Sequence, residues 1–110
     1  MAVYFTTSQP AKLLADYKKK IDSGNVVTWA YDQDGDFTHT ADQWKYKAWL
    51  RPAVEDDRLA FYIIKNTKRT LTPTIYAIYH GRFIESLLIH CDKLFTDGIA
   101  TALPASKDGV

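Results

Sequence analysis

The segment RLAFYIIK, residues 58–65, is apolar at nearly every position, and its length is that of a single β-strand. Successive side chains of a strand point to opposite faces of the sheet. A strand that is apolar on both faces is typical of the centre of a sheet whose two faces are both covered. We therefore place residues 58–65 in the middle of a sheet and assign the other segments around it.

Four further segments have strand character. Residues 44–51, WKYKAWLR, alternate between an apolar face and a basic face, and Pro52 is expected to end that strand. Valine, threonine and aromatic residues, which favour pleated structure, are frequent in the other three. These are AVYFT at 2–6, NVVTWAY at 25–31 and DGIATAL at 97–103.

The first predicted helix starts near Pro10, a residue that suits the first turn of a helix. Thr7 or Ser8 is expected to cap its N-terminus, because both carry a hydroxyl that accepts a backbone hydrogen bond. Gly24 follows its apolar stripe and is expected to end it.

The second predicted helix covers residues 73–95 and begins after the capping pair Thr72-Pro73. An apolar stripe at helical spacing runs along it and contains His80 and Cys91, which we expect to be core residues. Because IYAIY also has strand propensity and Gly81 interrupts the segment, a strand followed by a helix is the alternative.

The predicted order is β-α-β-β-β-α-β, which indicates the α+β class: a mostly antiparallel sheet of about five strands with two helices packed on it. Residues 37–43 lie between two strands, and Thr40 and Gln43 have the spacing of a capping box, which suits one short helical turn. We expect a single domain over residues 1–103 and a flexible C-terminal tail at 104–110.

Composition favours an ordinary cytoplasmic protein. The net charge is +1, from 14 basic and 13 acidic residues, so no global field attracts nucleic acid or an acidic membrane. The chain has a single cysteine, which excludes an internal disulfide. We see no signal peptide and no apolar run long enough for a membrane span.

The acidic loop DQDGD, residues 32–36, has alternating carboxylates of the kind that bind calcium. The loop departs from the EF-hand pattern, because its glycine stands at position 4 instead of 6 and position 12 is Gln43. We interpret it as a tight turn and expect neither a metal site nor a cofactor.

Two alternatives for function depend on polar side chains. A small enzyme or ligand-binding domain would have its site near residues 32–39, and its candidate residues are Asp36, His39, Trp49 and Arg51. In the weaker alternative, nucleic acid binds to the strand face formed by Lys45, Lys47, Trp49 and Arg51, which Lys68 and Arg69 could extend. The same face is also typical of any solvated strand, so we expect nucleic-acid binding to be weak at most.

The leading hypothesis is a non-catalytic protein-interaction or binding domain. The chain lacks HExxH, CxxC and GxSxG motifs, and it carries seven tyrosines, five phenylalanines and three tryptophans. The predicted second helix is apolar around most of its circumference, so we expect a protein partner or a second copy to cover one flank. The interface candidates on that flank are Ile78, Arg82 and Ile89.

Overall fold

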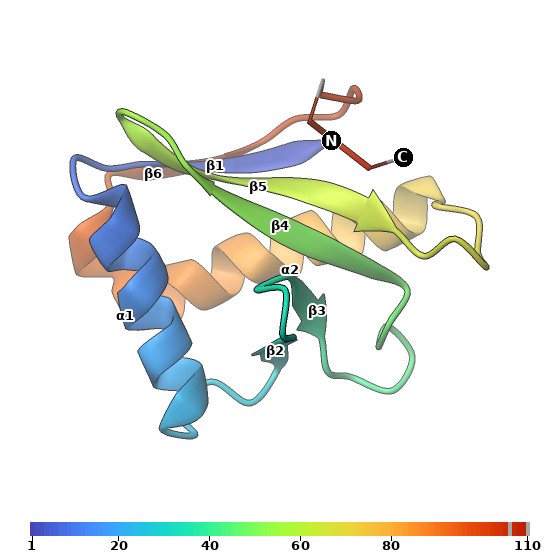
Figure 1. Ribbon diagram of the computed structural model, residues 1–110, viewed down its shortest axis with the longest axis horizontal. Coiled ribbons are helices and arrows are strands. Elements are labelled where there is room, and N and C mark those ends of the chain that lie inside the picture. Colours follow the sequence, from blue (N-terminus) through green and yellow to red (C-terminus); the bar gives the residue numbers. More distant parts are fainter. Residues whose placement is uncertain (106, 110) are drawn as a thin grey trace.

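The computed structural model describes residues 1–105 and 107–109, which contain six strands, two long helices and one 3₁₀ turn. In chain order these are β1 (Ala2–Thr6), α1 (Pro10–Asp22), β2 (Trp29–Tyr31), β3 (Phe37–His39), β4 (Ala48–Val54), β5 (Arg58–Lys65), α2 (Pro73–Cys91), the 3₁₀ turn (Asp92–Leu94) and β6 (Asp97–Ala100). The strands form one antiparallel sheet in the order β2-β3-β4-β5-β1-β6 (Figure 1). The predicted α+β class is therefore confirmed.

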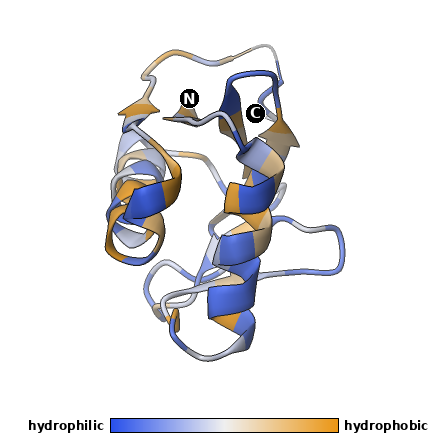
Figure 2. Cartoon of the chain, turned by 90° about the vertical axis from the view of Figure 1, so that its left-hand side faces the viewer, coloured by the Kyte–Doolittle hydropathy of each residue, from blue (hydrophilic) through white to orange (hydrophobic). Residues whose placement is uncertain are grey.

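Both helices contribute to a single core against the sheet. Leu13 of α1 belongs to the same buried cluster as Leu87 of α2. The ring of Phe83, from α2, lies 4.5–6.1 Å from the rings of Phe5, Tyr17, Trp29, Phe37 and Phe61. Hydrophobic and hydrophilic residues alternate along both helices, as expected of elements with one buried face (Figure 2).

The opposite face of the sheet is partly covered by the C-terminal segment. Tyr62 of β5 is 5% exposed and belongs to a second small cluster, against which Ala105 packs. Gly109 forms a parallel bridge with Ile64, and the Asp108 carboxylate lies 3.1 Å from the N-terminal ammonium of Met1. This packing explains why β5 is apolar on both faces, as the sequence predicted for a central strand.

The strand predicted at 25–31 is shorter than expected, because its first residues hydrogen-bond to the last turn of α1. The amides of Asn25 and Val26 both donate to the carbonyl of Lys20, at 2.9 and 3.0 Å. Gly24, the predicted stop, has φ of 82°, which glycine adopts without steric cost. Pairing therefore starts only at Trp29.

An additional strand, β3, stands where the sequence prediction had an unassigned segment with a short helical turn. Phe37 and His39 pair with β2, and the turn comes later, with the Trp44 amide donating to the Ala41 carbonyl at 2.8 Å. Capping-box spacing at Thr40 therefore lies next to a real turn but did not reveal the strand that precedes it.

The strand predicted at 44–51 is displaced toward the C-terminus and runs from Ala48 to Val54. The prediction that Pro52 ends the strand is wrong, since Pro52 pairs with Phe61 of β5. On its other side β4 pairs with β3 only through Leu50 and Phe37. Pro52 thus lies where β4 has an open edge, and its missing N–H removes no ladder hydrogen bond.

Residues 72–91 decide between the two predictions for the second helix. The Thr72 hydroxyl accepts a hydrogen bond from the Ile75 amide at 3.2 Å, and α2 continues without a break through Gly81. The helix ends at Cys91 instead of residue 95, and the chain then makes the 3₁₀ turn.

At the first helix the prediction of a Thr7 or Ser8 cap is wrong: the capping position is Gln9.

The last predicted strand, 97–103, is shorter in the structure and ends at Ala100. Residues 106 and 110 of the predicted tail lie outside the described residues, and the flexibility of 104–110 stays a prediction. Within the described part of the chain, neither helix has the length and apolar character that a membrane crossing requires.

Candidate functional site

Asp36 and Arg51, two candidates from the sequence, bind each other. The Arg51 guanidinium donates from Nε to Oδ1 of Asp36 at 3.0 Å and from Nη2 to Oδ2 at 2.9 Å. The Asp36 side chain is 7% exposed, whereas that of Arg51 is 56% exposed. This bidentate pair raises the pKa of Arg51 and links the start of β3 to β4.

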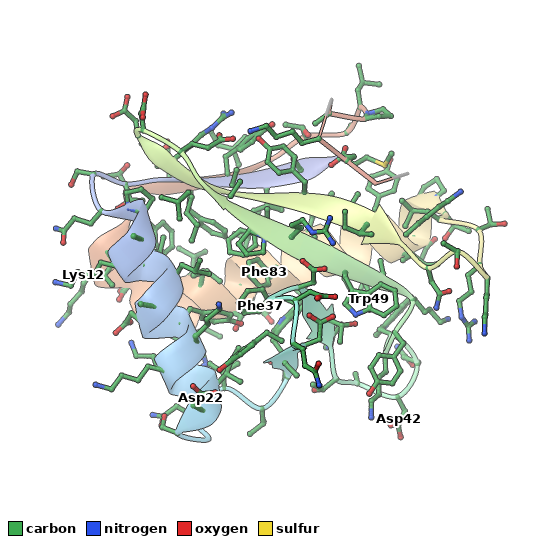
Figure 3. All side chains as sticks on the ribbon, viewed as in Figure 1. Lys12, Asp22, Phe37, Asp42, Trp49 and Phe83 are labelled. Atoms are coloured by element: carbon green, nitrogen blue, oxygen red, sulfur yellow. The ribbon has the colours of Figure 1, made fainter. Side chains whose placement is uncertain are left out.

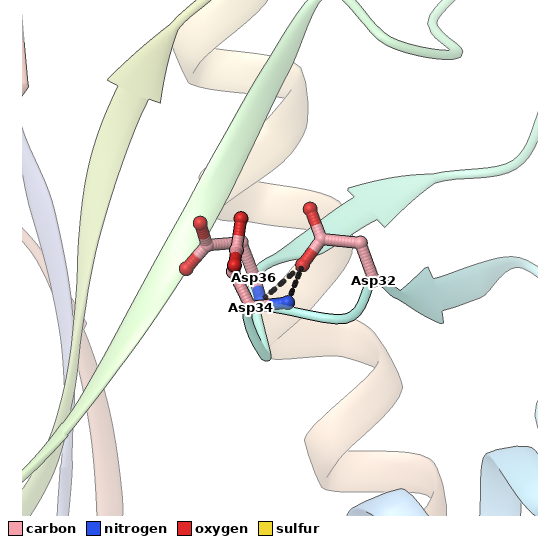
Figure 4. Close-up of side chains that lie close together, drawn as sticks. All are labelled: Asp32, Asp34 and Asp36. Atoms are coloured by element: carbon pink, nitrogen blue, oxygen red, sulfur yellow. Dashed lines mark hydrogen bonds between the residues drawn. The ribbon is translucent and has the colours of Figure 1, made fainter.

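The acidic loop is closed by its own side chain. One carboxylate oxygen of Asp32 accepts hydrogen bonds from the amides of Asp34 and Asp36, at 2.9 and 3.0 Å (Figure 4). Gly35 has φ of 83°, the left-handed conformation that the turn requires. One oxygen from each of the three carboxylates lies within 4.8 Å of the other two. The turn uses one oxygen of Asp32, and Arg51 binds both oxygens of Asp36.

His39 lies elsewhere and is buried. Its ring lies tilted against that of Trp29, with the centroids 4.9 Å apart, and its Nδ1 accepts a hydrogen bond from the Ala41 amide at 3.3 Å. Burial lowers the pKa of His39, and the nearby Arg82 lowers it further. The contacts of His39 are thus separate from the Asp36–Arg51 pair, and the ligand-binding role of these residues stays a prediction.

Cys91 is similarly engaged. Its thiol donates to Asp16 Oδ2 at 3.3 Å, and burial together with this bond raises the pKa of Cys91 to about 12. A thiol of that pKa is protonated at neutral pH and is a poor nucleophile. The state of Cys91 therefore does not support a mechanism with a covalent cysteine intermediate.

A different group of side chains meets at one end of the sheet. We call it the basic end and define it by its members: Lys45, Tyr46, Lys47, Trp49, Lys65, Lys68 and Arg69. Ala48 pairs with Lys65 and brings the residues before β4 close to the residues after β5. The Asn66 side-chain amide also donates to the Tyr46 carbonyl at 2.8 Å and joins the two loops.

The five cations of the basic end make no ion pair with any acidic group in the described residues. Lys65, Lys68 and Arg69 line a hollow of about 540 Å³. Met1, Thr67, Thr70 and Leu71 complete its wall. Hydroxyl groups and cations around one hollow suit an anionic ligand.

Aromatic rings stand beside these cations. Tyr46 and Trp49 are stacked, with their ring centroids 6.4 Å apart and their planes inclined by 22°. The Lys45 ammonium lies 5.1 Å from the Tyr46 centroid, within reach of a cation–π attraction. Figure 3 shows Trp49 near the start of β4, on the same side of the molecule as the loop that carries Asp42.

The sequence pointed to part of this group. Lys45, Lys47 and Trp49 belonged to the proposed basic strand face, and Lys68 and Arg69 were its proposed extension. The fourth residue of that face, Arg51, is bound to Asp36. Tyr46 was missed because it was assigned to the apolar face of a strand. No glycine or asparagine marks the turn at 44–47, so the usual signals for a turn are absent there.

The interface candidates lie on the outer side of α2. Arg82 is exposed, Ile78 is half-buried, and Ile89 is 67% exposed, next to Leu88 at 51%. The position of these residues is compatible with an interface, and the self-association proposed from the sequence stays a prediction.

Comparison of the chain with protein-family models, with curated proteins and with solved structures gives no match in any of the three. Function is therefore inferred from the side chains and their contacts.

Proposed function

We propose that the protein is a non-catalytic binding domain that takes an anionic ligand at the basic end. The observation that carries the proposal is the set of five cations without an acidic partner in the described residues, three of which line one hollow. Of the nine lysines and arginines outside the basic end, four are paired with a carboxylate in the described residues, among them Arg51 with Asp36 and Arg58 with Glu55, and five are not. Charges that are left unpaired together create a local positive potential although the net charge is only +1.

A binding role is favoured over catalysis by the state of the reactive groups. Asp36 is held by Arg51, the Cys91 pKa is raised to about 12, and His39 is buried against Trp29. A general base or nucleophile has to reach its substrate and change its protonation state near neutral pH. The basic end instead offers permanent positive charges, which can bind an anion without any proton transfer or covalent step.

The test is calorimetric titration with tripolyphosphate at low salt and at physiological salt. We expect binding that weakens as salt rises, and we expect the double variant Lys68→Glu with Arg69→Glu to weaken it by about tenfold or more. Both side chains are exposed, so the melting temperature should change little.

The matched control reverses two charges elsewhere. Lys12 and Lys19 are exposed residues of α1, and Lys12→Glu with Lys19→Glu changes the net charge by the same amount. Equal loss of binding in both double variants would mean that only overall charge matters. No binding by the parent protein would refute the proposed function.

A further inference from the structure

The strained backbone of Tyr46 is the feature from which the ligand class follows. Tyr46 has φ of 60°, the left-handed region that side-chain-bearing residues avoid, and it is the one residue other than glycine with positive φ in the described chain. Its amide donates to the Thr38 hydroxyl at 3.3 Å, and its carbonyl accepts from Asn66. These two hydrogen bonds hold the strained backbone in place, and strained residues that are held in this way are concentrated at functional sites.

The consequence of this strain is an exposed ring in a basic setting. The Tyr46 side chain is 53% exposed, although tyrosine is a residue that packing would normally bury. It is stacked with Trp49, so the pair presents an extended aromatic surface. A planar ring of a ligand can stack on the exposed part of that surface.

The cations lie around the end of the sheet and not on a single face. Directly paired residues of neighbouring strands point to the same side, so Lys65 shares the side of Ala48, which is the helix-covered side. Trp49 follows Ala48 and therefore points to the other side. A ligand that uses both the aromatic pair and the hollow has to bend around the sheet end.

We propose that this ligand is single-stranded nucleic acid, with a base stacked on Tyr46 and backbone phosphates bound by the cations of the hollow. The inference rests on the proposed function. A simple phosphate compound would use the hollow and leave the aromatic pair without a role, and an acidic peptide backbone has no planar ring. A single strand supplies both regularly spaced phosphates and planar bases, and it bends easily where a duplex is stiff.

The experiment measures fluorescence anisotropy of a labelled oligothymidylate of about 12 nucleotides, a length within the range of small single-strand sites. Tyr46→Ala is expected to weaken oligonucleotide binding by about tenfold, the effect of losing one stacked base. The same variant should bind tripolyphosphate as well as the parent does. Tyr46→Phe keeps the ring and should keep the affinity.

The outcomes separate this inference from the proposed function. If Tyr46→Ala leaves oligonucleotide binding unchanged while Lys68→Glu with Arg69→Glu abolishes it, the anion site stands and base stacking is wrong. If a duplex of the same length binds more tightly than the single strand, the single-strand assignment is wrong. If a poly-glutamate peptide binds as tightly and also depends on Tyr46, the partner is an acidic protein. If neither the oligonucleotide nor tripolyphosphate binds the parent, both proposals fail.

A thermal melt of each variant completes the design. Alanine at position 46 keeps the same backbone requirement as tyrosine, so Tyr46→Ala should fold with a nearly unchanged melting temperature. If it does not fold, Trp49→Leu removes the other ring of the pair, and the same selective loss of oligonucleotide binding is expected.

Discussion

His80 shows how burial sets the chemistry of one side chain. It is 3% exposed, and its Nε2 has no hydrogen-bond partner in the described residues. Burial favours the neutral ring and lowers the pKa of His80 from its usual 6.5 to about 4. The N-terminal ammonium lowers it further, and Asp108 opposes the shift. The burial of His80 agrees with the core role expected from the sequence, but the satisfied hydrogen bond expected with it is not found at Nε2 among the described residues.

The stability of the protein should therefore fall as the pH drops from about 6.5 to about 4. In this range His80 takes up a proton in the unfolded chain but not in the folded one, so acidification favours unfolding. The difference between the two pKa values corresponds to roughly 3 kcal/mol of unfolding free energy. Urea unfolding at pH 7 and near pH 4 measures it.

His80→Leu isolates this contribution. The leucine variant should lose less stability on acidification than the parent does, because His39 and the carboxylates titrate in both proteins. The same dependence on pH in parent and variant would show that His80 is not responsible.

At the scale of elements, the sequence predicted segments whose environment is encoded in their own residues. The strands at 2–6 and 58–65 have the predicted bounds, because their apolar residues alone specify burial. The strand β3 could not be predicted, because three residues are too few to show an alternating pattern. Its assignment depends on pairing with β2, for example of His39 with Trp29, and local sequence does not show pairing. The same holds for the basic end, where Tyr46 is placed by Thr38 and Asn66, which lie 8 and 20 residues away.

The helix α2 has two faces of different consequence for stability. Leu87 is fully buried in the main core, whereas Ile89, two residues later, is 67% exposed. Leu87→Asp would bury an unpaired charge, and we expect it to unfold the protein or to lower its stability by about 4 kcal/mol or more. Ile89→Glu should change stability by about 0.5 kcal/mol at most. A folded Leu87→Asp protein with an unchanged melting temperature would contradict the assigned faces.

The outer face of α2 also allows a test of the predicted self-association. Light scattering of the parent should show an oligomer, and Ile78→Glu with Ile89→Glu should give a folded monomer. A parent that is monomeric at high concentration would contradict self-association and leave only a foreign partner for this face.

At the scale of the whole molecule, the C-terminal segment is fastened through Asp108. The buried Asp108 carboxylate lies 3.1 Å from the N-terminal ammonium and accepts hydrogen bonds from the amides of Ile63 and Ala105, at 3.2 and 2.6 Å. Gly109 continues the contact, with its amide donating to the Ile63 carbonyl at 2.9 Å. One carboxylate thus joins both chain ends to the central strand.

Removing that carboxylate should release the segment. We expect Asp108→Ala to lower the unfolding free energy by about 2 kcal/mol, because an ammonium and two amides lose a charged acceptor. Hydrogen exchange at the amides of Ile63 and Lys65 should become faster, and urea unfolding measures the free energy. Unchanged exchange at both amides would show that Asp108 does not hold the segment, as a flexible tail would predict.

The position of β1 has a consequence for the time that folding takes. This strand lies between β5 and β6 in the sheet, so Phe5 pairs with Leu59 on one side and with Gly98 on the other. During synthesis the ribosome adds about 90 residues after Phe5 before Gly98 is made. At roughly 5–20 residues per second, β1 waits roughly 5–20 s with its second edge open. Contacts this distant in sequence form slowly, so the nascent chain exposes an unpaired edge of a hydrophobic strand for seconds. This edge is a binding site for a chaperone during that interval.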